Sequence, residues 1–236
     1  MTETSTVPAV PDLALRWCRM WNAEPTLAHE LLTPDAVQWS GLTPGLDDLV
    51  GPEPTVPFMT RWAIDPGPRF TPRLAAADGA GWLAYCWDAV LPDGRILSGL
   101  DVNALRDGRV AENWTIAGDR RITAADPTPR SASRDVLLGV ARGWARGTEA
   151  VLAPDVVLHS RLAEVGDVDG RDAVAAVLRA RGAAAVHREP IVDPDRGTAT
   201  VMWTAPTGGN GLDLLVVRDD RVVDVRSFPA ARPFRY

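Results

Sequence analysis

The chain has 236 residues, of which 46% are hydrophobic, and a formal net charge of −6 at pH 7. This length allows one large domain or two of ordinary size. The acidic balance, without any basic run, argues against nucleic-acid binding. All 25 basic residues are arginine, which excludes a Schiff-base lysine and a phosphate-binding P-loop.

Targeting signals and cofactor motifs are not expected either. No apolar run approaches the ~18 residues of a membrane span, and the first residues lack the basic and apolar regions of a secretory signal. Cys18 and Cys86 lack paired spacing, which predicts free thiols in a reducing cytosol. The histidines are scattered, and no dinucleotide glycine pattern or nucleophile elbow occurs. We therefore expect a cytoplasmic protein that uses no metal or cofactor and binds no membrane.

The chain opens with an amphipathic helix, for which Asp12 is the expected N-cap and Trp17 and Trp21 share the apolar stripe. A short strand, a proline-weakened helix, a further strand and a long antiparallel meander follow. These are expected at 37–40, 55–62, 70–75 and 82–118. Helices followed by a curved antiparallel sheet indicate an α+β fold, in which the sheet wraps the helices into a cone with a ligand site inside.

The meander is predicted from two Asp-Gly pairs, at 93–94 and 107–108, that each separate two apolar runs. If both are two-residue turns, Cys86 faces Asp101 and Asp101 faces Trp114. One face then collects acids, an amide and indoles, namely Trp82, Cys86, Asp88, Asp101, Asn103, Glu112 and Trp114. The opposite face is apolar and collects Leu83, Tyr85, Trp87, Leu100, Val102 and Ala104.

The second half of the chain repeats the first. LLTPDAVQWS at 31–40 is echoed by VLAPDVVLHS at 151–160, and LDVNALRDGRVAENW at 100–114 by LDLLVVRDDRVVDVR at 212–226. VGPEPTVPFMTRW at 50–62 is likewise echoed by DGRDAVAAVLRAR at 169–181. The order and offset are kept, so we predict two copies of one domain, residues 1–123 and 124–236. A Pro-, Ser- and Asp-rich linker at about 119–133 joins them.

The segments RWCRMWN at 16–22, PDAVQWSG at 34–41 and GLDVNALRDGRVAENW at 99–114 resemble the nuclear transport factor 2-like superfamily, in particular its SnoaL-like polyketide cyclases and ketosteroid isomerases. APDVVLHS, GRDAV and LDLLVVRDDRV carry the same resemblance in the second copy. It implies tandem cone-shaped α+β barrels. The superfamily hosts isomerases, cyclases, dehydratases, epoxide hydrolases and binding proteins, so fold alone does not select a function.

The resemblance places some residues in roles and not others. Asp101 and Asp213 align with the acid that ketosteroid isomerases keep protonated to hydrogen-bond a developing oxyanion. The tyrosine of that family's first helix aligns with Trp17, and its general-base aspartate aligns with Ser40 or Ser160. These departures speak against steroid-isomerase chemistry itself. What the resemblance implies is a cavity with an acid on the central strand.

Asp101, Asp88 and Glu112 are the predicted catalytic residues. Carboxylates that lie close together with little solvation cannot all ionise, so one would stay protonated as a general acid beside an ionised base. The alternative is that Asp88 and Glu112 end their strands in water. Substrate-binding candidates are Trp17, Trp39, Trp82, Asn103 and Trp114, as a flat aromatic pocket or as ordinary core. Trp87 and Trp203 align with each other and are assigned to packing on the opposite face.

In the second copy the same register makes Asp213 face Arg226 and Leu215 face Asp224. This predicts an ion pair in a scaffold domain. Alternatively, Asp213, Arg226 and Asp224 form a set similar to the acid, base and positioning groups of limonene-type epoxide hydrolases. His159, at the end of a strand, is a candidate general base.

The apolar outer faces of the two predicted sheets would leave large exposed patches on separate domains, and such patches mark interfaces. We therefore expect an internal pseudo-dimer that is a monomer or part of a higher oligomer. The leading hypothesis is a cofactor-independent cyclase, isomerase or dehydratase acting on a hydrophobic polyketide-like or polycyclic molecule in secondary metabolism. The rival hypotheses are a non-catalytic binding or accessory protein and a structural protein with filled cavities.

Overall fold

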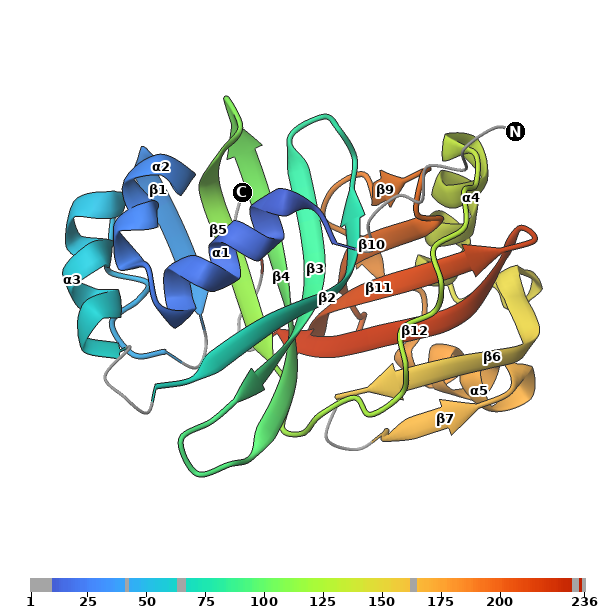
Figure 1. Cartoon of the computed structure of the whole chain (residues 1–236). Helices are drawn as coiled ribbons and strands as arrows, with labels where there is room; N and C mark the ends of the chain where they lie inside the picture. Colours follow the sequence, from blue (N-terminus) through green and yellow to red (C-terminus); the bar gives the residue numbers. More distant parts are fainter. Residues whose placement is uncertain (1–9, 41–42, 63–66, 162–164, 231–233, 235–236) are drawn as a thin grey trace, which may run out of the picture.

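A computed structural model describes residues 10–40, 43–62, 67–161, 165–230 and 234. It contains two mixed β-sheets with helices on their outer flanks (Figure 1). The first half of the chain forms α1 (Asp12–Asn22), α2 (Ala28–Leu31), β1 (Leu32–Ser40), α3 (Pro52–Trp62), β2 (Arg69–Ala77), β3 (Trp82–Val90), β4 (Ile96–Arg106) and β5 (Arg109–Ala117), with a short 3-10 turn at Pro25–Leu27. The order of its five strands is β1-β5-β4-β3-β2.

The second half forms α4 (Arg134–Ala145), a 3-10 turn at Glu149–Val151, β6 (Leu152–Ser160), β7 (Asp167–Asp169), α5 (Arg171–Arg181), β8 (Ala185–Val186), β9 (Ile191–Asp193), β10 (Thr198–Thr204), β11 (Asn210–Arg218) and β12 (Arg221–Ala230). Its strands follow the order β7-β6-β12-β11-β10-β8, and β9 also pairs with β10. None of the helices in the described ranges is long and apolar enough to cross a bilayer. Cys18 and Cys86 are buried free thiols.

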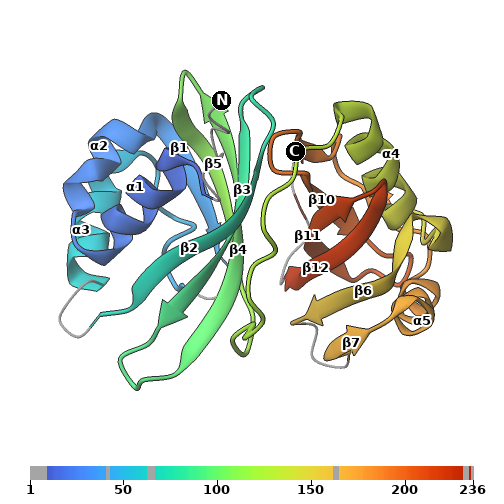
Figure 2. The same cartoon turned by 45° about the vertical axis from the view of Figure 1, so that its right-hand side comes forward.

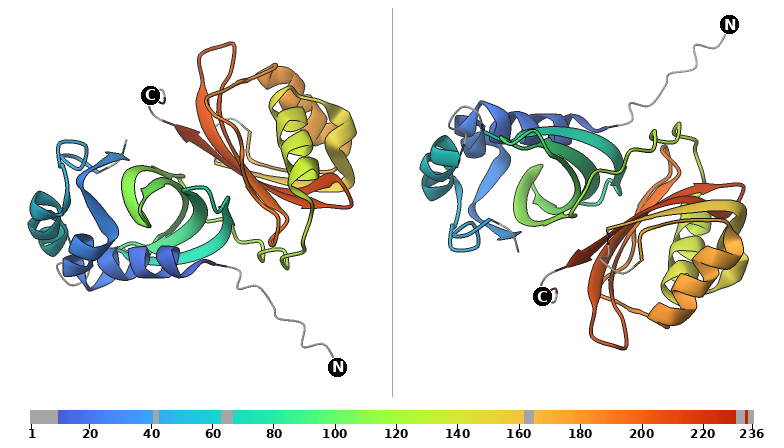
Figure 3. Two further views of the ribbon diagram at one scale, coloured as in Figure 1. Left: turned by 90° about the horizontal axis from the view of Figure 1, so that it is seen from above. Right: turned by 90° about the horizontal axis from the view of Figure 1, so that it is seen from below.

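The two sheets lie face to face, with α1–α3 outside one sheet and α4 and α5 outside the other (Figures 2 and 3). Leu100 of β4 and Leu214 of β11 are both fully buried in one apolar cluster that joins the sheets. The segment after β5 runs between the sheets, and Ile122 is buried in the same cluster. Each sheet therefore has one face toward its own helices and one toward the other sheet.

The sequence predicted antiparallel sheets, but each sheet also contains one parallel pair of strands. β1 pairs with β5 in parallel, and β6 pairs with β12 in the same way. The expectation came from hairpins, which join sequential strands. β1 has no hairpin to β5, because three strands lie between them in the sequence, so hairpin geometry does not fix its direction. Ser40 at the end of β1 consequently pairs with Thr115.

The hairpin that joins β3 to β4 lacks the predicted two-residue turn. The Leu91 amide donates to the Arg95 carbonyl at 2.8 Å, which leaves a three-residue loop, 92–94. Pro92 has no N–H, so it cannot make the closing pair with Arg95 that a two-residue turn requires. Gly94 takes a φ of 83°, as expected in a three-residue hairpin loop. The predicted register of β3 against β4 was therefore wrong by one residue.

The hairpin that joins β4 to β5 has the predicted two-residue turn, and residues 107–108 have φ values of 53° and 75°. A bulge follows directly, because Leu105 pairs with Val110 whereas Ala104 pairs with Glu112. The extra residue moves β5 by one position relative to β4. The predicted facing of Asp101 with Trp114 was wrong for this reason.

The second sheet contains the same combination of a two-residue turn and a β-bulge. Its turn at 219–220 also has positive φ values, and a bulge follows because Val217 pairs with Val222 whereas Val216 pairs with Asp224. The two halves thus share both the turn and the irregularity next to it. The predicted facing of Asp213 with Arg226 was wrong by the same one-residue shift.

Because side chains alternate along a strand, each one-residue shift turns the whole strand over. Only β4 keeps the face predicted for it. Asp101 pairs with Tyr85 and with Thr115, and these pairs share the face toward the helices. That inner face carries Tyr85, Trp87, Asp101, Asn103, Asn113 and Thr115. The face toward the other sheet carries Trp82, Cys86, Asp88, Leu100, Val102, Glu112 and Trp114.

Trp87 lies over a glycine. Its ring occupies the space above Gly99, where an added Cβ would lie 2.1 Å from the Trp87 Cζ2 atom. We predict that Gly99→Ala lowers the free energy of unfolding by about 1–3 kcal/mol, because the indole must move. Gly139→Ala is the control. Nothing lies within 4 Å of that helical position, so alanine there should be neutral or stabilising. Urea denaturation of both variants checks this, and equal effects would contradict the packing described.

Candidate functional site

A cavity of about 210 Å³ lies between α1 and the inner face of the first sheet. Its walls are mostly apolar and aromatic, and its polar atoms come chiefly from β4, β5 and the end of β1. Lining residues are Trp17, Cys18, Trp21, Ser40, Thr43, Leu46, Pro68, Phe70, Tyr85, Trp87, Ala89, Leu91, Leu97, Asp101, Asn113, Thr115 and Ala117. Among these described residues Asp101 is the only carboxylic acid, and none is basic.

The aromatic wall is a continuous edge-to-face series. The Trp21 and Phe70 ring centroids are 6.4 Å apart, and those of Phe70 and Trp87 are 5.3 Å apart, both with steep interplanar angles. Such pairs are favourable beyond the area that they bury. They hold the wall of the cavity in a defined shape between helix α1, strand β2 and strand β3.

Asp101 is 3% exposed and accepts hydrogen bonds on both carboxylate oxygens. The Trp87 Nε1 donates to Oδ1 at 2.8 Å, and the Tyr85 hydroxyl donates to Oδ2 at 2.9 Å. The Asn113 amide donates to Oδ2 at 3.3 Å, and the Thr115 hydroxyl also hydrogen-bonds the carboxylate. Each of these partners is neutral, so within the described part of the chain the carboxylate has donors and no counter-ion.

Burial and these donors act on the pKa of Asp101 in opposite directions. Removal from water disfavours the charged form and raises the pKa, whereas the hydrogen bonds from Thr115, Trp87, Tyr85 and Asn113 favour the charged form and lower it. The burial effect is the larger, and the pKa of Asp101 is raised above 3.8. The cavity thus holds an acid whose proton is retained to a higher pH than usual.

A further hydrogen-bonded residue, Asn103, holds the Asn113 side chain that donates to Asp101. The Asn113 amide also donates to the Asn103 Oδ1 at 3.0 Å, and the Asn103 amide donates to the Leu83 carbonyl at 3.4 Å. Asn103 therefore lies buried behind Asn113. It was predicted to line the cavity, but it is not among the lining residues. Burial beside Asp101 raises the pKa of Tyr85 well above its usual value. Burial, with the Asp101 charge as a smaller cause, also raises that of Cys18, so both stay protonated.

The other two predicted acids lie on the opposite face of the sheet. Asp88 is paired with Arg73 at 3.3 Å and with Arg121 at 2.9 Å, and it accepts from the Ser98 hydroxyl at 2.6 Å. Arg73 also donates to the Ile122 carbonyl, so the group anchors the segment after β5. The prediction that Asp88 shares a patch with Asp101 was wrong, because β3 is turned over.

Glu112 lies on that outer face as well, where the Trp39 Nε1 donates to its carboxylate at 2.5 Å. Partial burial raises the pKa of Glu112, while this hydrogen bond lowers it. Trp82 and Trp114 stack with centroids 6.0 Å apart in the cluster between the sheets. Trp39, Trp82 and Trp114 therefore do not line the cavity, and the prediction that they do was wrong. Trp17 does line it, as predicted.

Four residues around Asp101 were not among the predicted site residues: Tyr85, Trp87, Asn113 and Thr115. Tyr85 and Trp87 were assigned to the outer face and Asn113 and Thr115 to no role, because each depends on the register of β3 or β5. The signal for β3 was Pro92, which rules out the two-residue turn. No comparable signal marks the bulge beside Ala111.

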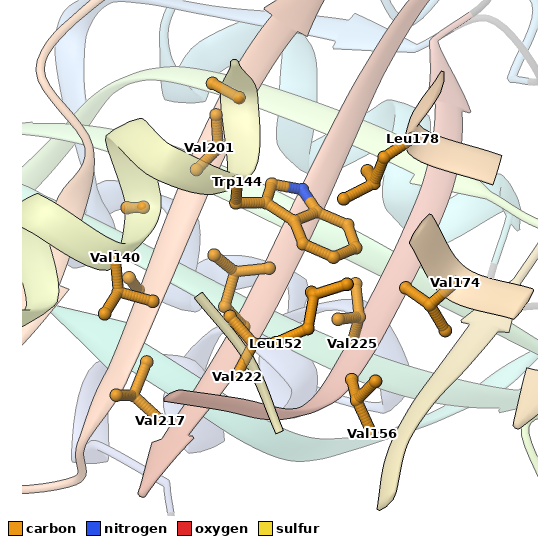
Figure 4. Packing of buried hydrophobic residues seen from close by; sticks show 14 of the residues in the cluster. Val140, Trp144, Leu152, Val156, Val174, Leu178, Val201, Val217, Val222 and Val225 are labelled. Carbon is orange, nitrogen blue, oxygen red and sulfur yellow. The ribbon is translucent and has the colours of Figure 1, made fainter. Parts of the chain in front are cut away.

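The inner face of the second sheet carries the equivalent acid, and the described residues around it are closely packed. Asp213 is 0% exposed and pairs with Arg181, whose Nη1 lies 3.2 Å from Oδ2. The Trp144 Nε1 donates to Oδ2 at 2.7 Å, and the Ser227 hydroxyl donates to Oδ1 at 2.6 Å. Figure 4 shows Trp144 surrounded by packed side chains from α5 and from strands of the second sheet. This interior is filled by the chain's own residues.

The predicted Asp-Arg-Asp set does not assemble. Asp224 and Arg226 pair with each other at 2.8 Å on the face toward the first sheet, whereas Asp213 points to the helices. His159 lies beside them, with its Nε2 3.3 Å from Asp224 and its Nδ1 3.7 Å from Asp167. His159 therefore belongs to a buried charged group between the sheets and not to the interior of the second sheet. The bulge in β12 is the physical reason for the separation.

Solved structures with a similar fold each cover less than half of the chain. They include an isomerase candidate of the SnoaL-like family from Agrobacterium tumefaciens (18% identity, 44% of this chain and 93% of that chain, TM-score 0.39). An NTF2-like protein of unknown function from Mesorhizobium loti has 20% identity over 45% of this chain and 88% of that chain (TM-score 0.37). A polyketide cyclase candidate from Xanthomonas campestris has 18% identity over 44% and 85% (TM-score 0.34).

No family model and no curated protein matches the sequence. The three structures named above are below 25% identical to the chain and have TM-scores below 0.4. The function proposed below therefore rests on the geometry of the cavity.

The buried ion pair between Arg181 and Asp213 generates the first of two predictions about the buried acids. Arg181→Met keeps most of the side-chain volume but leaves Asp213 as a buried charge without a counter-ion, which should cost about 3–5 kcal/mol of unfolding free energy. Arg179→Met, two positions earlier in α5, breaks an exposed pair with Glu149 and should change little. Chemical denaturation measures both. Similar losses for the two variants would contradict the filled interior described here.

The raised pKa of Asp101 generates a second prediction. The folded state holds the Asp101 proton more tightly than the unfolded chain, so this group's contribution to stability is complete below the usual pKa and is lost as pH rises through the raised one. The unfolding free energy of the wild type minus that of Asp101→Asn should therefore fall as pH rises from about 4 toward neutrality. Urea unfolding at a series of pH values measures this difference. A difference that grows with pH would show that the hydrogen bonds outweigh burial.

Proposed function

We propose that this protein is a cofactor-independent enzyme that moves a proton on a small, flat, hydrophobic substrate held in the cavity beside Asp101. The observation that carries this proposal is a single carboxylic acid with a raised pKa in the wall of an otherwise uncharged aromatic cavity. Perturbed acids in clefts are typical of acid–base catalysis. The domains concerned would be residues 1–123, with the site, and 124–236.

The presence of one acid favours particular reactions. With Asp88 and Glu112 on the far side of the sheet, the described lining residues offer Asp101 no second carboxylate as a partner. It would remove a proton from the substrate in its ionised form and return it in its protonated form. An isomerisation needs only such a shuttle, and an aldol-type ring closure can use one as well. A dehydration that requires a separate acid and base at once fits this site less well.

The neighbours of Asp101 would position the carboxylate. Trp87 and Tyr85 donate to different oxygens, which fixes the plane of the carboxyl group against the cavity. The apolar walls would exclude water, so the charge that develops on the substrate meets fixed dipoles and not bulk solvent. Tyr85 and Thr115 carry hydroxyl groups that can turn toward a substrate oxygen when Asp101 is protonated.

The second half would act as a partner for the first. Its inner face replaces two polar positions of the site with apolar ones: Val201 stands where Tyr85 does, and Val225 where Asn113 does. Its outer face packs on the first sheet through Leu212 and Leu214. We propose that the halves form an internal pseudo-dimer in which the second half stabilises the first and performs no chemistry.

A non-catalytic binding protein is the second candidate. The specific observation in its favour is that the four donors around Asp101 match the four lone-pair sites of a carboxylate, which leaves little capacity to accept a substrate proton. Such a saturated acid would orient a ligand without reacting. The two candidates differ in whether Asp101 removes a proton from a bound molecule.

A base-sensitive probe tests the proposal. 5-Nitrobenzisoxazole is a flat bicycle that opens to a coloured phenolate when a base removes its ring C–H proton. The wild type should open it in a saturable manner, and Asp101→Asn should lower kcat/KM by about 100-fold, the lower end of the range for a positioned base.

Glu112→Gln is the matched control, because it removes a carboxylate with a raised pKa from the opposite face of the same sheet. It should leave kcat/KM of the probe unchanged. Saturable quenching of tryptophan fluorescence by the probe without turnover would contradict the enzymatic proposal and support the binding protein. Equal losses in both variants would contradict the assignment of the site.

A further inference from the structure

The two halves build the same frame around their acids. In the first half Trp87 pairs with Gly99, and Asp101 follows two residues later on the same face. In the second half Trp203 pairs with Gly211, and Asp213 follows two residues later. An added Cβ would lie 2.1 Å from the indole at Gly99 and 2.3 Å from it at Gly211. Each half therefore lays an indole beside a buried carboxyl group.

In the second half a cation fills this frame. The Arg181 guanidinium pairs with Asp213 at 3.2 Å, and its Cζ lies 5.0 Å from the Trp203 ring centroid and 5.6 Å from that of Trp144. Its Nη2 also donates to the Trp144 carbonyl at 2.7 Å. The acid and two indoles thus enclose a guanidinium, which satisfies both the charge of the acid and the negative faces of the rings.

In the first half the frame is present and the cation is not. The described lining residues of the cavity include no arginine or histidine, and all described partners of Asp101 are neutral. The sequence repeat aligns Arg181 with Trp62, a residue without charge. Indoles nevertheless remain around the acid, since Trp17, Trp21 and Trp87 all line the cavity. The first half therefore has the acid and the aromatic walls, and a cavity in place of the arginine.

From this comparison we infer that the substrate of the proposed site carries an organic cation, an amine or a guanidinium, which pairs with Asp101 between the indoles as Arg181 pairs with Asp213. This inference deepens the proposed function and rests on it. A neutral ligand would fill the cavity but make no charge-assisted hydrogen bond with Asp101. A carboxylate or phosphate ligand would meet a like charge and no basic group.

A matched pair of probes tests the inference. 1-Naphthylmethylamine and 1-naphthalenemethanol have the same flat body, and the first is a cation at neutral pH whereas the second is neutral. Calorimetric titration of the full chain should show the amine binding with a stoichiometry of one and at least about tenfold more tightly than the alcohol, because a desolvated cation meets an acid and indole faces. Asp101→Asn should remove this advantage, whereas Glu112→Gln should retain it.

The outcomes separate the two levels of the proposal. If the alcohol binds as tightly as the amine, or if Asp101→Asn keeps the preference for the amine, the cation inference is overturned and the proposed site stands. If neither probe binds and the nitrobenzisoxazole is not opened, the proposed function fails with it. A stoichiometry of two would also overturn the inference, because Arg181 should already occupy the second frame.

Discussion

The desolvation of one carboxyl group is the constraint on which the rest of the site depends. Asp101 is held away from water by aromatic walls, and this burial raises its pKa even though four neutral donors oppose the effect. An acid with its ordinary pKa is a weaker base and removes a proton from carbon more slowly near neutral pH. A carboxylate that is buried without hydrogen-bond donors would lower the free energy of unfolding. Tyr85 and Trp87 donate hydrogen bonds to the buried carboxylate, and because both are neutral they place no positive charge beside it.

The same frame has two outcomes within one chain. In the first half the space beside the acid is a cavity, and in the second half Arg181 occupies the equivalent space. The polar neighbours differ accordingly, because an acid with an internal counter-ion does not need Tyr85 or Asn113, and valines stand at those positions. The outer face of the second sheet packs against the outer face of the first sheet.

The sequence could predict the α+β class, the longer helices α1, α3, α4 and α5, the order of the strands within each meander and the position of Asp101 on an inner face. It could not predict the wall around Asp101, because that wall depends on two one-residue choices. Pro92 forces a three-residue loop, which turns Tyr85 and Trp87 inward and Asp88 outward. The bulge beside Ala111 turns Asn113 and Thr115 inward and Glu112 outward. A loop and a bulge differ from their alternatives by little free energy locally, and packing across the sheet decides between them.

A titration of Asp101 itself tests the central claim most directly. The carboxyl carbon of this residue, assigned in the NMR spectrum by comparison with Asp101→Asn, reports its protonation as the pH is changed. The account predicts a midpoint above the usual 3.8, because burial outweighs the donors. A midpoint below that value would show an acid held ionised by its hydrogen bonds, and it would contradict a proton-transfer role for this site.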